Sequence, residues 1–198
     1  MSRLKSPFLW FILLLLGLAV LTVLGPEEKS LGQNVRIVYL HGAWVLTALV
    51  VFIAAGFMGL VAVLTRRSGA HDWSKALGRA AIVFWVTYLP LSLWAMQTNW
   101  NGLYLSEPRF RVAVIFAGAG VLLQIGLSII HRPSLTSLAN ILFAAALVWT
   151  LQNTGSVLHP PPSPIFSSGI ASIEIFFVVE NLVALFAAFM LSRWWLGK

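Results

Sequence analysis

The sequence predicts an all-α, polytopic membrane protein with six transmembrane helices, because two properties of the chain agree. Of its 198 residues, 59% are hydrophobic and only 10% are charged, and its mean hydropathy of +0.89 is far above that of a soluble domain. Apolar runs of roughly 20 residues recur along the chain, and each is long enough to cross about 30 Å of hydrocarbon as a helix. The runs are continuous rather than alternating, which excludes a transmembrane β-barrel.

The first apolar run, residues 8–24, follows a basic start and resembles a signal peptide. The residues after it contain no Ala-x-Ala-type cleavage pattern, so we expect a retained membrane anchor. Gly25-Pro26 is expected to end this helix.

The second run, residues 37–65, is longer than a perpendicular span requires. Its helix is expected to tilt, or to raise its first one or two turns above the hydrocarbon. The second arrangement places Tyr39, His41 and Trp44 at the membrane interface. The basic residues 66–79 are predicted to form a loop.

Four more spans follow, and the division of lysine and arginine between their ends predicts the orientation of the chain. Nine basic residues lie at one set of helix ends and four at the other, and the richer set is expected in the cytoplasm with both termini. Residues 1–198 then form one multi-pass domain in the plasma (inner) membrane. The further spans are residues 80–97, 112–130, 135–151 and 169–191, and the outer segments are residues 25–36, 98–111 and 152–168.

Composition and motifs exclude several classes of function. The formal charge of +7 is interpreted as topology and contact with membrane lipid rather than nucleic-acid binding. The chain has no cysteine, which excludes thiol redox chemistry and Fe–S ligation within it. No sequence motif of a hydrolase, kinase or protease is present, so we do not expect an enzyme.

Histidine is the remaining strong metal ligand. His41 and His159 are predicted on the outer side, whereas His71 and His131 are predicted inside. An outward pair from different segments could ligate haem iron axially. Alternatively, His41 is an interfacial residue that bonds a carbonyl, and His159 is an ordinary loop residue.

Three arginines, Arg36, Arg109 and Arg111, also belong to the predicted outer side. Arginine pairs bidentately with carboxylates, so these side chains are candidates to hold acidic groups such as haem propionates. Alternatively, these arginines are anchors at the membrane interface, or Arg109 pairs with Glu107 across the Pro108 turn.

Aromatic residues gather near the same boundary, among them Trp44, Trp100 and Tyr104. They form either an aromatic belt at the interface or a flat platform for a planar ligand, and composition does not separate the two.

Two carboxylates, Glu174 and Glu180, lie in the last span, and Glu180 is predicted near mid-bilayer. An ionised carboxylate is costly there. Glu180 is interpreted either as part of a proton or substrate path, or as a structural hydrogen-bond partner of Gln124 or Asn140.

Residues 35–44, Val-Arg-Ile-Val-Tyr-Leu-His-Gly-Ala-Trp, resemble the start of the second span in the haem-handling membrane proteins of cytochrome c maturation, above all the six-span C subunit of that system. Residues 100–110 fall where that family has an outer tryptophan-rich segment. Glu107 then stands at the family's aspartate and Arg109 at its arginine, while Leu103, Tyr104 and Ser106 replace tryptophans. Leu158-His159 matches the Leu-His context of the second family histidine.

The resemblance implies a protein that binds b-type haem without a covalent bond at the outer membrane face. It assigns the axial ligands to His41 and His159, and it places the segment that contains Glu107 against the haem. The haem would pass to a haem chaperone during c-type cytochrome assembly, and further partners would be other maturation membrane subunits and an ABC-type transporter. The alternatives are a structural subunit of such a complex without its own haem, and a transporter centred on Glu180. In the haem hypothesis Arg36, Arg109 and Arg111 hold the propionates, and Trp44, Trp100 and Tyr104 cover the ring.

Overall fold

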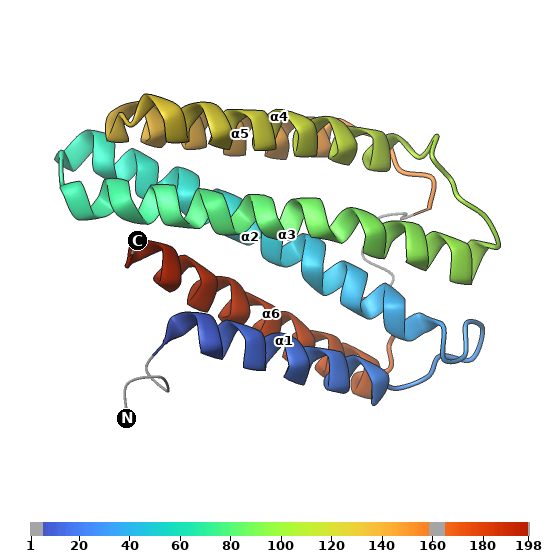
Figure 1. Cartoon of the computed structure of the whole chain (residues 1–198). Helices are drawn as coiled ribbons and strands as arrows, with labels where there is room; N and C mark the ends of the chain where they lie inside the picture. Colours follow the sequence, from blue (N-terminus) through green and yellow to red (C-terminus); the bar gives the residue numbers. More distant parts are fainter. Residues whose placement is uncertain (1–5, 159–164, 198) are drawn as a thin grey trace.

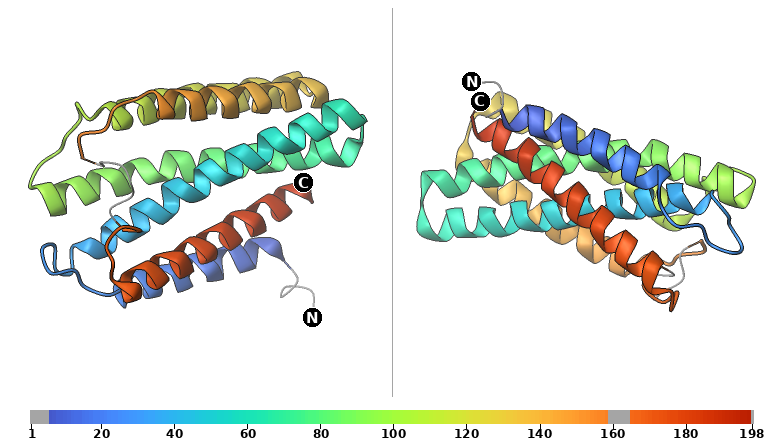
Figure 2. Two further views of the ribbon diagram at one scale, coloured as in Figure 1. Left: turned by 180° about the vertical axis from the view of Figure 1, so that it is seen from behind. Right: turned by 90° about the horizontal axis from the view of Figure 1, so that it is seen from below.

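The computed structural model describes residues 6–158 and 165–197. Helices pack in three layers, with the α2–α3 pair in the middle, α4 and α5 on one side, and α1 and α6 on the other (Figures 1 and 2). The helices within the described residues are α1 (Pro7–Val23), α2 (Val35–Thr65), α3 (Ser68–Trp100), α4 (Pro108–Ile130), α5 (Pro133–Gln152) and α6 (Ala171–Leu196).

The connections divide between the two ends of the bundle. The short turns at residues 66–67 and 131–132 lie at the end where α1 starts and α6 finishes, which we call the termini end (Figure 1). The longer connections lie at the opposite end, called the loop end, and their described residues are 24–34, 101–107, 153–158 and 165–170.

Five helices, α2 to α6, are long and apolar enough to cross a membrane, and α1 is an apolar helix of 17 residues. These helices indicate a multi-pass membrane protein, as the composition predicted. At 1.5 Å per residue, the 31 residues of α2 and the 33 residues of α3 extend over about 47 and 50 Å, well beyond the hydrocarbon thickness.

The prediction of a loop at residues 66–79 is wrong. Arg66 adopts a left-handed conformation with φ of 56°, the chain turns there, and α3 begins at Ser68. The following turns are amphipathic, because Ser74 is buried and donates to the carbonyl of Ala55 in α2 at 2.9 Å, while Lys75 is exposed. Hydropathy alone missed this helix because its exposed face is charged.

A buried polar network joins the middle layer to α4 and α5. Asn140 of α5 donates to the Ser74 carbonyl at 2.9 Å and accepts from Gln124 of α4 at 3.3 Å. At the same level, His71 Nδ1 lies 2.7 Å from the Ser137 hydroxyl. Because Asn140 and Gln124 bond to each other, they are not the partners of Glu180 that the sequence suggested.

Candidate functional site

His41 lies in the second turn of α2 and is only 9% exposed. Its ring faces Tyr88 of α3, with 5.7 Å between the ring centroids. Tyr39, two residues earlier, is 1% exposed and packs against Phe176 of α6. Both side chains are therefore buried within the bundle, because α3 covers one face of this part of α2 and α6 covers the other.

Trp44 continues the face of α2 that contains His41. Its indole N–H donates to the Thr87 hydroxyl at 2.8 Å, and its ring lies 4.7 Å from that of Phe84. The α2–α3 interface at the loop end thus presents an imidazole, a phenol and an indole within a few turns. Trp44 is held by a hydrogen bond and a ring contact rather than lying free in a membrane belt.

Glu107 is the best anchored residue of the predicted outer segment 98–111. It is 2% exposed, and its carboxylate accepts hydrogen bonds from the backbone N–H groups of Val157 and Leu158, both at 3.2 Å, and from the Ser156 hydroxyl at 3.4 Å. Within the described residues it has no ion-pair contact with Arg109. The carboxylate therefore fastens the α3–α4 connection to the segment that leads to His159.

His159 itself lies outside the described residues, and so does the rest of the stretch 159–164. The residues on either side are both attached. Leu158 is bound to Glu107, and Ile165 lies against α2, with its Cδ1 atom 3.8 Å from where a Cβ on Gly42 would stand. The residue before this stretch, Leu158, therefore bonds to Glu107, and the residue after it, Ile165, lies beside Gly42, which follows His41 in the chain.

Residues 98–111 do not form one continuous half-buried surface. Thr98 to Trp100 complete α3, residues 101–107 connect the helices, and Pro108 begins α4. Tyr104 is 48% exposed in this connection, whereas Trp100 is half-buried. The break follows from Asn101, whose φ of 53° ends α3.

The three candidate arginines differ in their surroundings. Arg36 donates from Nε to the Gly25 carbonyl at 2.9 Å and pairs with Glu27 at 3.4 Å, so it closes the α1–α2 connection. Arg111 is exposed. Arg109 Nε is buried and has no hydrogen-bond partner among the described residues, which makes it the arginine best suited to a further acidic group.

Two polar groups of the loop end are of the kinds that bind haem. His41 offers a buried imidazole, which is a common iron ligand, and the half-buried Arg109 offers a buried Nε donor that lacks a partner among the described residues. Haem carries two carboxylates, which Arg109 is suited to pair with. Arg36 and Glu107 already have protein partners in this structure, which support the connections around the site.

The carboxylates of α6 lie apart from these residues. Glu174 accepts from the Gly169 N–H at 3.1 Å and helps to start α6. Glu180 is fully buried and lies 2.5 Å from the Thr22 hydroxyl of α1. Thr22 is next to the last residue of α1, so Glu180 is level with the loop end of that helix rather than at its middle.

Sequence reasoning did not single out Tyr88, Thr87 or Thr22, although each contacts a candidate residue. Thr22 carried a usable signal, since a polar side chain in an apolar span needs a partner. Tyr88 and Thr87 carried none, because hydropathy does not reveal which helices face one another.

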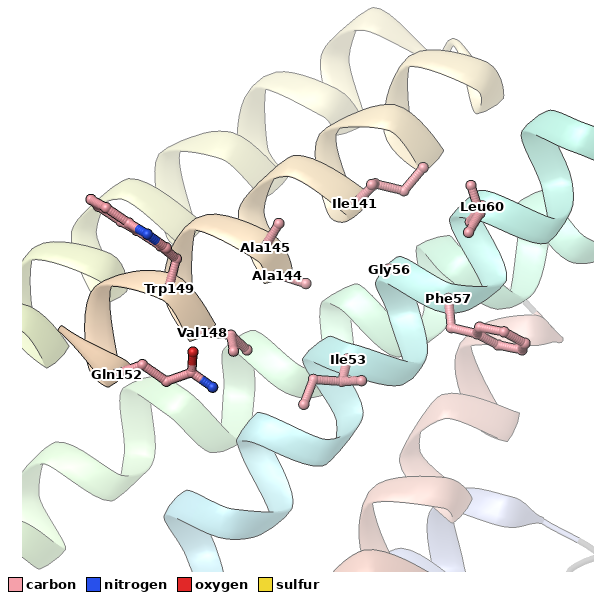
Figure 3. A pocket seen from close by; sticks show the side chains of 10 residues that line it. All are labelled: Ile53, Gly56, Phe57, Leu60, Ile141, Ala144, Ala145, Val148, Trp149 and Gln152. Atoms are coloured by element: carbon pink, nitrogen blue, oxygen red, sulfur yellow. The ribbon is translucent and has the colours of Figure 1, made fainter.

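The surface also has an apolar groove of about 460 Å³ between α2 and α5 (Figure 3). Gly56 and Ala144 form its narrow floor, and Gln152 is the polar side chain at one end. None of the candidate haem residues lines it. The lining residues are Ile53, Gly56, Phe57, Leu60, Ile141, Ala144, Ala145, Val148, Trp149 and Gln152.

Comparisons of the chain with protein-family models, with curated proteins and with solved structures returned no match. The functional proposal therefore depends on the residues and contacts described above.

Proposed function

We propose that this multi-pass membrane protein binds haem non-covalently at its loop end and passes it on during c-type cytochrome assembly. The observation that carries this proposal is the buried Glu107 carboxylate and its bonds to Val157 and Leu158. Three sequence segments that resemble haem-handling motifs are far apart in the chain. Glu107 fastens the second to the third, and Ile165 lies against the first, next to His41.

In this proposal haem is cargo, and the protein holds it by coordination and charge. His41 and His159 would ligate the iron, and Arg109, Arg111 and Arg36 would hold the propionates. Trp44, Trp100 and Tyr104 would cover the ring. Cysteine is absent from the chain, which suits a protein that releases haem instead of attaching it through thioether bonds.

The topology that supports this function places the loop end outside the plasma (inner) membrane. Of the described basic side chains, six belong to the termini end, namely Arg66, Arg67, Lys75, Arg79, Arg132 and Arg193, and four belong to the loop end, namely Lys29, Arg36, Arg109 and Arg111. The excess favours cytoplasmic termini. A haem chaperone would then meet the loop end from outside, and other maturation subunits or an ABC-type transporter would contact the membrane face.

The test is an absorbance titration of the purified full-length protein with haemin. We expect the wild type to produce a saturable Soret band, and His41→Ala and His159→Ala each to weaken binding at least about tenfold, which corresponds to about 1.4 kcal/mol. The matched controls are His71→Ala and His131→Ala at the termini end, which should bind haemin as the wild type does.

An unchanged Soret titration in the double variant of His41 and His159 would show that the ligands are assigned wrongly. A wild type that binds no haemin but copurifies with another membrane protein would instead indicate a structural subunit.

A further inference from the structure

Glu180 of α6 shares the hydroxyl group of Thr22 with a backbone carbonyl. The Thr22 hydroxyl lies 2.5 Å from Glu180 Oε1 and 2.9 Å from the carbonyl of Leu18. A hydroxyl has one proton to donate, and a carbonyl only accepts. An ionised Glu180 would have to share the single Thr22 proton with the Leu18 carbonyl in a bifurcated bond, whereas a neutral Glu180 carboxylic acid that donates to Thr22 makes both contacts full hydrogen bonds.

Three buried polar atoms of α2 and α6 have no hydrogen-bond partner among the described residues. They are Glu180 Oε2, the Tyr39 hydroxyl and the Thr47 hydroxyl, and their residues are 0%, 1% and 0% exposed. Tyr39 and Thr47 are eight residues apart on α2 and therefore share a face. Ala43, midway between them, packs in the same cluster as Phe177 of α6. That face of α2 is thus directed toward α6, which carries Glu180.

Unsatisfied polar atoms are rare in protein interiors, and they are commonly bridged by buried water. Here two hydroxyl donors and a carboxyl oxygen face one interface between α1, α2 and α6. Each of the three atoms can bond to buried water.

The site lies close to the loop end. Thr22 is one residue from the end of α1, where the polar connection 24–34 begins. Phe176 lies one turn before Glu180, with its ring 5.5 Å from the Tyr39 ring, and a Cβ on Gly25 would come within 2.8 Å of it. The Phe176 ring therefore separates this interface from the α1–α2 connection.

The charged and titratable groups around the site are few. Helix α1 carries no charged residue between Pro7 and Val23, and α2 contributes the phenol of Tyr39. Glu28 lies in the connection above, where the hydroxyl and N–H of Ser30 hold the pKa of its carboxylate below the usual range. Glu174 is at the start of α6 and bonds to Gly169. No arginine or lysine contact to Glu180 occurs within the described residues.

We infer that Glu180, Tyr39 and Thr47 form a hydrated proton-binding site between α1, α2 and α6 that exchanges protons with the loop end past Phe176. Glu180 holds the proton as a carboxylic acid. On release the proton passes to water, giving a carboxylate and a hydronium ion, and water bonded to the Tyr39 and Thr47 hydroxyls stabilises the carboxylate. This site is independent of the haem proposal, since it uses the opposite face of α2 from His41.

The test is pH-difference infrared spectroscopy of the full-length protein in lipid nanodiscs. We expect a carboxylic-acid carbonyl band that shifts in D₂O and disappears reversibly as the pH is raised. Glu180→Gln should abolish this band, and Tyr39→Phe should move its frequency and its pH midpoint. Phe176→Ala should accelerate its shift after transfer to D₂O. The matched control Glu174→Gln should leave the band unchanged, and so should His41→Ala.

A wild type without the band, or a band that survives in Glu180→Gln, would overturn the assignment to Glu180. A band that belongs to Glu180 but responds neither to pH nor to D₂O would show a static structural hydrogen bond and no proton exchange. If Glu180→Gln does not fold, the Tyr39→Phe variant provides the test. A carbonyl band with unchanged frequency in Tyr39→Phe would contradict a site that Glu180 and Tyr39 share.

Discussion

Glu107 shows how one buried carboxylate can organise segments that are about 50 residues apart in the chain. It accepts two backbone N–H groups and one hydroxyl from residues 156–158. Hydrogen bonds to a charged acceptor are stronger than neutral ones. These contacts give a physical reason for an acid at this position, namely the attachment of the α3–α4 connection to residues 156–158.

Replacement of Glu107 should therefore loosen the loop end. We expect Glu107→Ala to lower the free energy of unfolding by about 1–3 kcal/mol, because it leaves the N–H donors of Val157 and Leu158 without their acceptor. Thermal unfolding in detergent measures the loss, and amide hydrogen exchange should increase at residues 157 and 158. The control Glu27→Ala, whose side chain is 52% exposed, should change stability little. Equal protection of both amides in Glu107→Ala and the wild type would refute the anchoring role.

Among the helices, close contact is concentrated where α2 meets α3 and α5. Gly59 of α2 is the tightest point, since a Cβ there would lie 2.6 Å from the backbone carbonyl oxygen of Ser137 in α5. A backbone atom cannot move aside as a flexible side chain can. Gly56 of α2 and Gly120 of α4 also lie at close contacts, since a Cβ there would lie 3.1 Å from the Ala144 Cβ or 2.5 Å from the Ile82 Cδ1, whereas a Cβ on Gly118 would have nothing within 4 Å.

These glycines provide a matched pair of substitutions. We expect Gly59→Ala to destabilise the protein by about 1–3 kcal/mol, because the added methyl group forces α2 and α5 apart. Gly118→Ala should cause no loss, because the methyl group enters open space and alanine favours the helix. Unfolding in detergent compares the two. A Gly59→Ala variant as stable as Gly118→Ala would mean that α2 and α5 are not packed as closely as described.

Hydropathy located the apolar centres of the helices but not their ends or their contacts. The turns of α3 from Ser68 onward were missed because Asp72, Lys75 and Arg79 lower the mean hydropathy of an amphipathic helix. The burial of Tyr39 and His41 was missed because an apolar run does not reveal which face meets another helix. Glu180 was noticed as unusual and Glu107 was assigned to the predicted site, yet their partners Val157, Leu158 and Thr22 come from distant segments, and only the packed chain brings them together.

At the scale of the whole molecule, the connections divide into two groups that lie at opposite ends of the bundle (Figure 1). Five helices are long enough to span a membrane, and the shorter α1 lies beside α6. In the proposed six-span arrangement α1 crosses as well, which would place both ends of the chain on one side. The orientation then depends on the basic residues, which are more numerous at the termini end.

The absence of cysteine from the chain makes this topology simple to test. We expect a cysteine at Ser106 to react with a membrane-impermeant maleimide added to intact cells, because that exposed residue lies in the connection 101–107. A cysteine at Ser134, also exposed but at the start of α5, should react only after permeabilisation. Labelling of both residues from outside, or the reverse order, would contradict the six-span arrangement with cytoplasmic termini.

The most direct measurement of the central claim is the electron paramagnetic resonance spectrum of ferric haem bound to the purified protein. Haem iron between two imidazoles is low-spin, so the wild type should give a low-spin signal that becomes high-spin in His41→Ala and in His159→Ala. The controls His71→Ala and His131→Ala should keep the low-spin signal. A high-spin wild type, or a low-spin signal that persists in both variants of the proposed ligands, would contradict a haem held between His41 and His159.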